Sequence, residues 1–215
     1  LLVLSYHFFP AALPGGFLGV NILFVLSGFL ISFHLIDEIY DNKTVDLKNF
    51  YYKRFVRIFP PALLMVFLTT MFAISINNDY TVRYFDQFVS AISFNYNLFE
   101  ILRGGSYEAQ FVKQLFMHTW SLAIEVHFYI VWPLIMVLIC KKSLGARSFK
   151  RRFSSNLIYT CLGIYLFSYI LMAILTSKAN ISTGFVYFFD LTRIGSFVIG
   201  SMLAVFVKRF SFKQM

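Results

Sequence analysis

The residues best suited to chemistry lie where a long apolar run begins. Residues 120–140 contain Glu125 as their only formally charged side chain, and the run is about long enough to cross roughly 30 Å of hydrocarbon. Helical spacing at steps of three or four places a set of polar and aromatic side chains on one face with Glu125. The set is His118, Ser121, Glu125, Tyr129 and Trp132. An acid inside a membrane is costly and usually functional, although a polar seam that joins helices is the alternative.

A histidine near the start of the chain is the candidate partner of this acid. His7 falls at the outer end of the first apolar segment, and Glu125 falls near the outer end of its own. A carboxylate can orient a neutral imidazole and stabilise its protonated form, which makes His7 a candidate general base for a hydroxyl. The alternative is a headgroup-level histidine without chemistry. His34 and His127 are predicted to be structural, the latter because it lies about 200° around the helix from Glu125.

A basic cluster precedes the third apolar segment. Arg54 and Arg57 share a helix face, with Lys53 beside them. Two guanidiniums so placed can bind the phosphates of a nucleotide-bearing donor from the cytoplasm. Ordinary positive charge flanking a membrane span explains the same residues.

The composition is that of a membrane protein with several spans. Hydrophobic residues make up 59% of the chain and charged residues 13%, far below the roughly 25% charged residues of soluble domains. We expect an all-α transmembrane bundle with six spans in view, at residues 1–9, 17–36, 56–76, 120–140, 157–175 and 191–207. Residues 84–98 are interrupted by polar side chains and are predicted to form an interfacial or re-entrant helix.

The loop charges predict the orientation of the spans. Segments 37–57, 141–152 and 208–213 hold 14 of the 19 Lys and Arg residues, so these loops are expected in the cytoplasm. The net charge of +9 then reflects topology and anionic lipid, and it predicts no nucleic-acid partner. No Cys/His cluster has the spacing of a metal site. Both ends break off within or beside apolar segments, so we expect a single domain, 1–215, cut at both ends.

Several segments together resemble one family, the acyltransferase-3 family of integral membrane sugar O-acyltransferases. The matching segments are Ser5-Tyr6-His7, GGFLGVNILFVLSGFLI at 15–31, FYYKRFVRIFP at 50–60, HTWSLAIE at 118–125 with Phe128-Tyr129, and Thr192-Arg193 leading to Gly200. The last segment is most similar to the branch that O-acetylates peptidoglycan or other envelope glycans.

The resemblance implies a role for each matching residue. His7 corresponds to the catalytic histidine, Glu125 to a second essential polar residue, and Arg54 and Arg57 to a basic pair on the acyl-CoA side. Members have further spans and sometimes an extracytoplasmic hydrolase-like domain that completes the transfer. Two departures stand out. A family arginine shortly before the histidine would precede Leu1, and Val126-His127 stand where many members carry Glu and Gln.

The sequence therefore predicts a multi-pass acyltransferase of the bacterial plasma membrane. An acyl group, most simply acetyl from acetyl-CoA, would pass to a hydroxyl of peptidoglycan or a surface polysaccharide. His7 and Glu125 would be catalytic, with no metal. Arg193 would stabilise negative charge or pair with Glu125, or form a structural ion pair. A proton-coupled transporter or acyl-group conduit is the rival, although neither inverted repeats nor paired broken helices are apparent. A helical scaffold without chemistry would leave Glu125 and the arginines unexplained.

The charge asymmetry makes a direct prediction about topology. Single cysteines placed within residues 100–110 should react with an impermeant maleimide added outside the cell, and those within 143–150 should not. Labelling after permeabilisation controls for reactivity. The reverse pattern would overturn the orientation.

Overall fold

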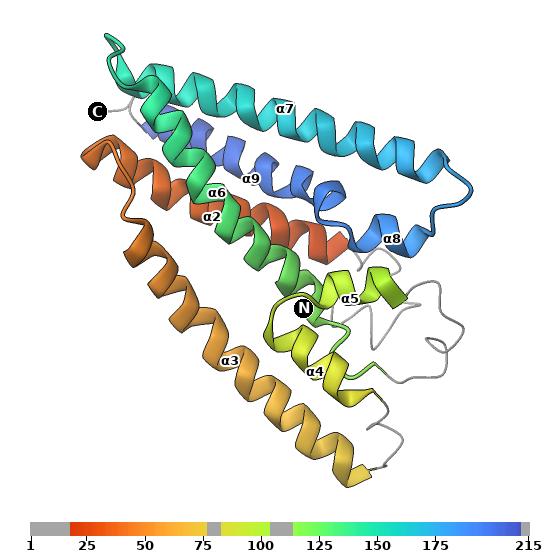
Figure 1. Ribbon diagram of the computed structural model, residues 1–215. Helices are drawn as coiled ribbons and strands as arrows, with labels where there is room; N and C mark the ends of the chain where they lie inside the picture. Colours follow the sequence, from red (N-terminus) through yellow and green to blue (C-terminus); the bar gives the residue numbers. More distant parts are fainter. Residues whose placement is uncertain (1–17, 77–82, 104–113, 212–215) are drawn as a thin grey trace. The chain divides into compact units, whose positions relative to one another are not determined.

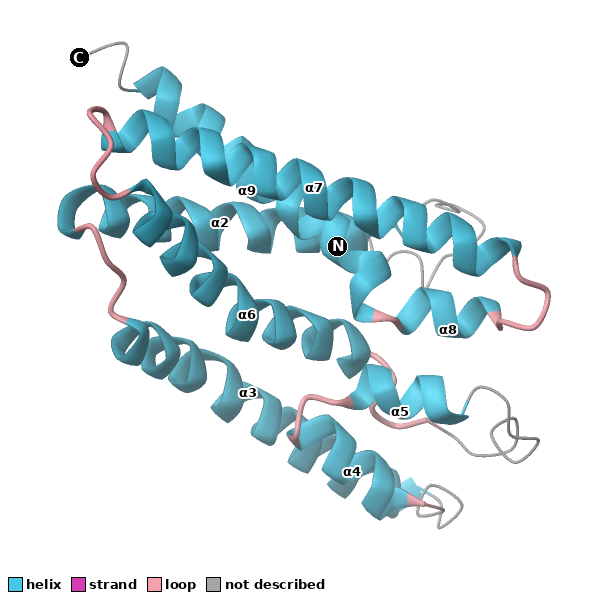
Figure 2. Ribbon diagram, turned by 45° about the horizontal axis from the view of Figure 1, so that its top comes forward, coloured by secondary structure: helices cyan, strands magenta, loops and turns pink. Residues whose placement is uncertain are grey.

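The computed structural model describes residues 18–76, 83–103 and 114–211, and every regular element in these residues is a helix (Figures 1 and 2). The helices are α2 (Leu18–Asn42), α3 (Leu47–Ile76), α4 (Tyr84–Ile92), α5 (Tyr96–Arg103), α6 (Thr119–Ser143), α7 (Phe149–Ser177), α8 (Thr183–Phe188) and α9 (Asp190–Ser211). Five segments of the described residues are long and apolar enough to span a membrane. The predicted all-α polytopic class is confirmed, and the span expected at 1–9 lies outside the described residues.

The helix that carries the basic cluster begins earlier than the sequence predicts. The expected span started at residue 56, whereas α3 starts at Leu47. Its first turn is capped by Asp46, whose carboxylate accepts the backbone N–H of Asn49 at 3.1 Å. Arg54 and Arg57, which were expected to share a helix face, therefore lie within one continuous helix.

The segment predicted as one interfacial helix is in fact two short helices, α4 and α5. The break falls at Phe94, whose φ of 54° lies in the left-handed region. Asn95 stabilises this turn, since its side-chain amide donates to the carbonyl of Ser93 at 3.0 Å. The turn lets α5 pack against α8 as well as α4.

The chain divides into two compact units. Unit 1 comprises residues 1–45, 131–171 and 191–215, and unit 2 comprises residues 46–130 and 172–190. Helix α6 therefore contributes its first half to unit 2 and its second half to unit 1. The same division assigns α2 and α9 to unit 1, and α3, α4, α5 and α8 to unit 2.

In unit 1, helices α2 and α9 pack backbone to backbone. A Cβ atom on Gly28 would lie 2.0 Å from the carbonyl oxygen of Phe197, and one on Gly200 would lie 1.9 Å from that of Val25. No side chain fits in either place. Small residues that allow such close approach are a common basis of helix association in membranes.

A chain of buried hydroxyl groups adds polar contacts to this interface. The indole N–H of Trp132 donates to Ser32 Oγ at 2.8 Å, and Ser32 donates to Ser201 Oγ at 2.7 Å. Ser32 and Ser201 are fully buried. Trp132 therefore joins α6 to α2 and α9.

Helix α7 covers the outside of unit 1. The hydroxyl groups of Tyr40 and Ser154 lie 2.6 Å apart, and the N–H of Gly195 donates to Ser168 at 3.3 Å. Large apolar side chains such as Tyr159 and Ile170 remain exposed on this helix. That exposure is expected of a helix whose other face meets lipid.

The close approach at Gly200 predicts a measurable loss of stability on adding one methyl group. Gly200→Ala should lower the free energy of unfolding by about 1–3 kcal/mol, because the backbone atoms it meets cannot move aside cheaply. Gly163→Ala is the matched control, since a Cβ there meets nothing within 4 Å. Unfolding midpoints of both variants in detergent give the comparison. Equal midpoints would show that α2 and α9 do not pack this closely.

Candidate active site

The candidate site is built on the antiparallel pairing of α3 with the first half of α6. The Tyr51 hydroxyl donates to the carbonyl of Ile130 at 2.8 Å, and further along, His118 Nε2 lies 3.4 Å from Met65 Sδ. Residue numbers rise along α3 as they fall along α6. This register places the basic cluster of α3 level with Glu125.

Arg54 and Arg57 line a cavity of about 400 Å³ together with Glu125 and Tyr129. The sequence had placed the arginines and Glu125 toward opposite faces of the membrane. The structure brings them onto the walls of one space. The reason is that α3 begins at Leu47, so Arg54 and Arg57 lie about two to three turns into a helix that runs antiparallel to α6.

The charged groups of this cavity are held by specific partners. The Tyr129 hydroxyl donates to the carboxylate of Glu125, one helical turn away. The guanidinium of Arg54 lies 5.3 Å from the centroid of the Tyr129 ring and 5.6 Å from that of Phe50. Cation–π contact suits the planar guanidinium and stabilises its charge in apolar surroundings. Tyr129 thus contacts both the carboxylate of Glu125 and the guanidinium of Arg54.

Two prolines add polar backbone to the same region. Pro60 and Pro61 lie in the interior of α3, and Pro61 lines the cavity. Proline has no N–H, so the carbonyl groups of Val56 and Arg57 lose their normal helical donors. A polar ligand in the cavity could use such a carbonyl as an acceptor.

A second cavity of about 390 Å³ shares Arg54, Ile58 and Tyr129 with the first. Its other walls are largely apolar and include Phe59, Phe94 and Val126. Arg54 and Tyr129 therefore lie between two cavities of different character. The first is lined by two guanidiniums and a carboxylate, and the second mainly by apolar side chains. A ligand with an anionic part and an apolar part matches this pair of cavities.

The other residues proposed from the sequence are placed as follows. His7 lies outside the described residues. Lys53 is exposed and lines neither cavity. Ser121 donates to the carbonyl of His118, a local contact within the first turns of α6. Arg193 lies in unit 1, where it donates to the side chain of Asn21 at 3.4 Å, and its pairing with Glu125 stays a prediction.

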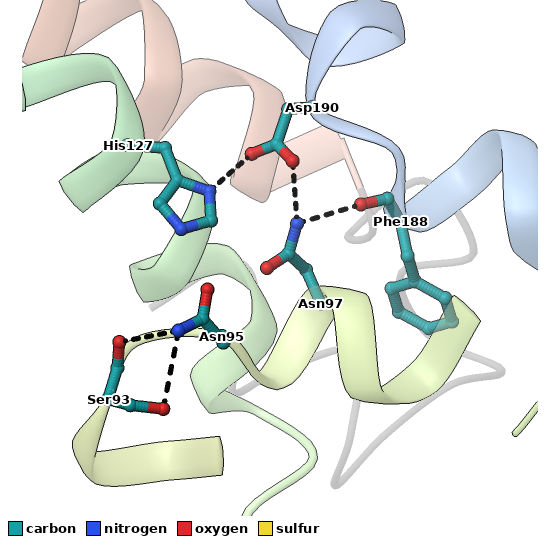
Figure 3. Close-up of polar contacts among 6 residues, drawn as sticks. All are labelled: Ser93, Asn95, Asn97, His127, Phe188 and Asp190. Carbon is teal, nitrogen blue, oxygen red and sulfur yellow. Dashed lines mark hydrogen bonds and ion pairs between the residues drawn. The ribbon is translucent and has the colours of Figure 1, made fainter. Parts of the chain in front are cut away.

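Sequence reasoning missed a polar cluster on the short helices of unit 2. His127, predicted to be structural, contacts the carboxylate of Asp190, which also binds Asn97 (Figure 3). Nearby in the sequence, Glu100 accepts a hydrogen bond from Gln114 at 3.0 Å, and burial raises the pKa of this carboxyl group. No local spacing links residues 97, 127 and 190, so only the fold could reveal this cluster.

Comparison with known proteins gives a consistent result. The family model of the acyltransferase domain (Acyl_transf_3) matches residues 1–215. The chain is 31% identical over 212 residues to O-acetyltransferase OatA of Staphylococcus aureus strain NCTC 8325 / PS 47, and equally to that of strain MRSA252. The match covers 99% of this chain but 34% of each relative, so the chain spans about a third of their length. No solved structure matches the chain.

The hydrogen bond from Tyr129 to Glu125 makes a testable prediction about stability. Tyr129→Phe removes one bond to a charged acceptor while keeping the ring against Arg54, and it should lower the free energy of unfolding by about 1–3 kcal/mol. Tyr52→Phe is the control, because the Tyr52 side chain is exposed. Unfolding midpoints in detergent measure the effect. If both substitutions shift the midpoint equally, the hydroxyl of Tyr129 does not hold the acid.

Proposed function

This chain belongs to the acyltransferase domain family, and we propose that it is the membrane part of an O-acetyltransferase acting on a cell-envelope glycan such as peptidoglycan. The single observation that carries the proposal is the cavity in which two arginines face a tyrosine-bound carboxylate. The names of the S. aureus relatives support the acetyl group and the oxygen acceptor. The family match favours this reading over the transporter or conduit that the sequence left open.

The donor in this proposal is acetyl-CoA. Arg54 and Arg57 supply the planar, always charged groups that bind phosphate oxygens in pairs of hydrogen bonds. The apolar cavity beside Arg54 offers a place for the uncharged part of the donor or for its acyl group. Because Glu125 lines the same cavity as the arginines, the phosphates and the acid act within one space.

The reaction is the attack of a hydroxyl oxygen on the carbonyl carbon of the thioester. The new C–O bond forms as the C–S bond breaks, and the proton of the hydroxyl passes through a base to the departing thiolate of CoA. We assign His7 as that base and Glu125 as the group that stabilises its protonated form. The hydroxyl belongs either to the glycan or to a carrier residue that hands the acetyl group on.

The remaining parts of the proposal concern the location and partners of the protein. The described helices make it a multi-pass membrane protein, and we propose the bacterial plasma membrane as its location. Its partners are then membrane lipid and the glycan acceptor. An extracytoplasmic hydrolase-like domain or protein would complete the transfer, which agrees with the greater length of the relatives.

The donor assignment is tested by changing the shape of one cation without changing its charge. Arg54→Lys should raise the acetyl-CoA concentration needed for half-maximal transfer roughly tenfold, since an ammonium group cannot reproduce the planar fork. The measurement is transfer of radiolabelled acetyl from acetyl-CoA to envelope glycan in membrane vesicles that contain the full-length protein.

Lys53→Arg is the matched control, because it makes the converse exchange at the adjacent, exposed position. It should leave the concentration dependence as in the wild type. An unchanged concentration dependence and maximal rate in Arg54→Lys would remove Arg54 from the donor site. Absence of glycan-linked label with the wild-type protein would overturn the proposed function itself.

A further inference from the structure

Three residues of unit 2 form a polar cluster around the carboxylate of Asp190, which belongs to unit 2 although it is the first residue of α9. His127 of α6 places its Nδ1 2.8 Å from one carboxylate oxygen. The side-chain amide of Asn97, on α5, donates to the other oxygen at 2.9 Å and to the carbonyl of Phe188 at 3.3 Å. Figure 3 shows the carboxylate between the imidazole and the amide. Both groups are therefore fixed in orientation by the same acid.

The contact with Asp190 determines which nitrogen of His127 can act as a base. A neutral imidazole that donates Nδ1–H to a carboxylate carries its lone pair on Nε2. Among the described residues, Nε2 of His127 has no hydrogen-bond partner, and Figure 3 shows it turned away from Asp190. The side chains of His127 and Asp190 are each 27% exposed, so the pair is not sealed inside the helices.

Asn97 contributes a second unused acceptor. Asn97 is fully buried, and its Oδ1 makes no hydrogen bond within the part of the chain that the structure describes. The amide nitrogen already binds Asp190, which leaves Oδ1 on the opposite branch of the amide. In Figure 3 this oxygen points to the side of the cluster on which the His127 ring lies. A buried acceptor without a donor is costly, so a ligand that supplies one is favoured.

Two acceptors and a carboxylate select a ligand by its chemistry. Nε2 of neutral His127 and Oδ1 of Asn97 both need donors, and Asp190 disfavours an anion. A compound with neighbouring hydroxyl groups meets these demands, whereas the phosphates of a nucleotide do not. Sugars are such compounds.

We propose that His127, oriented by Asp190, is a second general base of this enzyme and that it binds the acceptor hydroxyl together with Asn97. The inference rests on the proposed function and names the acceptor side of the same reaction. As the hydroxyl oxygen forms its bond to the acyl carbon, its proton moves to Nε2 of His127. The proton then passes to the atom released from that carbon, either the sulfur of CoA or the oxygen of an ester carrier.

The position of His127 on α6 separates this base from the donor cavity. Glu125 lines the cavity with the arginines, Val126 lines the apolar cavity, and His127 contacts Asp190. A transfer that passes through a carrier residue needs a proton acceptor in each half-reaction. Glu125 with His7 would serve the donor half, and His127 with Asp190 would serve the acceptor half.

The decisive variant is His127→Asn in the full-length protein. The asparagine amide nitrogen takes the place of Nδ1 and can still donate to Asp190, but asparagine has no group that accepts a proton, so a structural role would survive the change and a base would not. Transfer of labelled acetyl from acetyl-CoA to envelope glycan in vesicles should fall on the order of 10²- to 10⁴-fold. His34→Asn is the matched control and should retain the wild-type rate, because His34 contacts the ring of Phe33 and lies outside the site.

A rescue experiment distinguishes lost chemistry from lost structure. Added imidazole should restore transfer by His127→Ala, and more basic imidazoles should restore it better, because a free base replaces the missing one. Asp190→Asn should also reduce transfer by at least about tenfold, since the amide can stabilise neither the required tautomer nor the imidazolium. It provides the test if the His127 variants fail to accumulate.

The outcomes separate this inference from the proposed function. If the wild-type protein transfers acetyl and either His127→Asn or Asp190→Asn transfers it at an undiminished rate, the second base is overturned and the proposed acetyltransferase activity stands. Low transfer in His127→Ala without rescue by any imidazole would also overturn the base. No transfer by the wild-type protein would refute the proposed function first.

Discussion

Among apolar helices in a membrane, a polar group without a hydrogen-bond partner destabilises the fold, because the surrounding hydrocarbon offers no hydrogen bonds in place of water. Unit 1 meets this constraint with a closed chain of hydroxyl groups, in which Trp132 donates to Ser32 and Ser32 to Ser201. The chain can close only because Gly28 and Gly200 let the backbones of α2 and α9 touch. Close packing of the backbones and the buried hydrogen bonds thus depend on one another. A larger residue at Gly28 or Gly200 would separate the helices and break the hydrogen bonds as well.

Unit 2 meets the same constraint around a cavity, and the side chains proposed as functional line that cavity. Arg54 is stabilised by the faces of two aromatic rings, and Glu125 by the hydroxyl of Tyr129. Neither group is enclosed by neighbours on all sides, because both line a cavity of about 400 Å³. Named partners therefore hold these charges in place on the wall of a cavity. Such preorganised charge is what a catalytic site requires.

The sequence predicted the membrane helices well because hydrophobic runs of sufficient length have few alternatives. The expected spans fall inside the helices found, apart from the segment at 1–9 and residue 17 of the second span, which lie outside the described residues. The start of the third membrane helix was predicted too late. The expected span began at residue 56, whereas α3 begins at Leu47, with Asp46 capping its first turn. Charge alone does not show where a helix begins.

Other features lay beyond any local pattern. The break between α4 and α5 depends on the left-handed backbone conformation of Phe94, and phenylalanine is rarely found in that conformation. The contact of His127 with Asp190 and Asn97 joins three segments far apart in the chain. Periodicity placed His127 off the face of Glu125, but it could not show that His127 contacts Asp190 on that second face. A second face of a membrane helix can carry a second site.

Helix α6 shows how one short stretch can serve several environments. Successive residues of an α-helix are rotated by about 100°, so three consecutive side chains leave the axis in three directions. Here Glu125 lines the polar cavity, Val126 the apolar one, and His127 contacts Asp190. The order of these three residues sets the order of the three environments around the helix. Inserting one residue before Glu125 would rotate each side chain toward its neighbour's place, so this helix specifies the site by its register as much as by its composition.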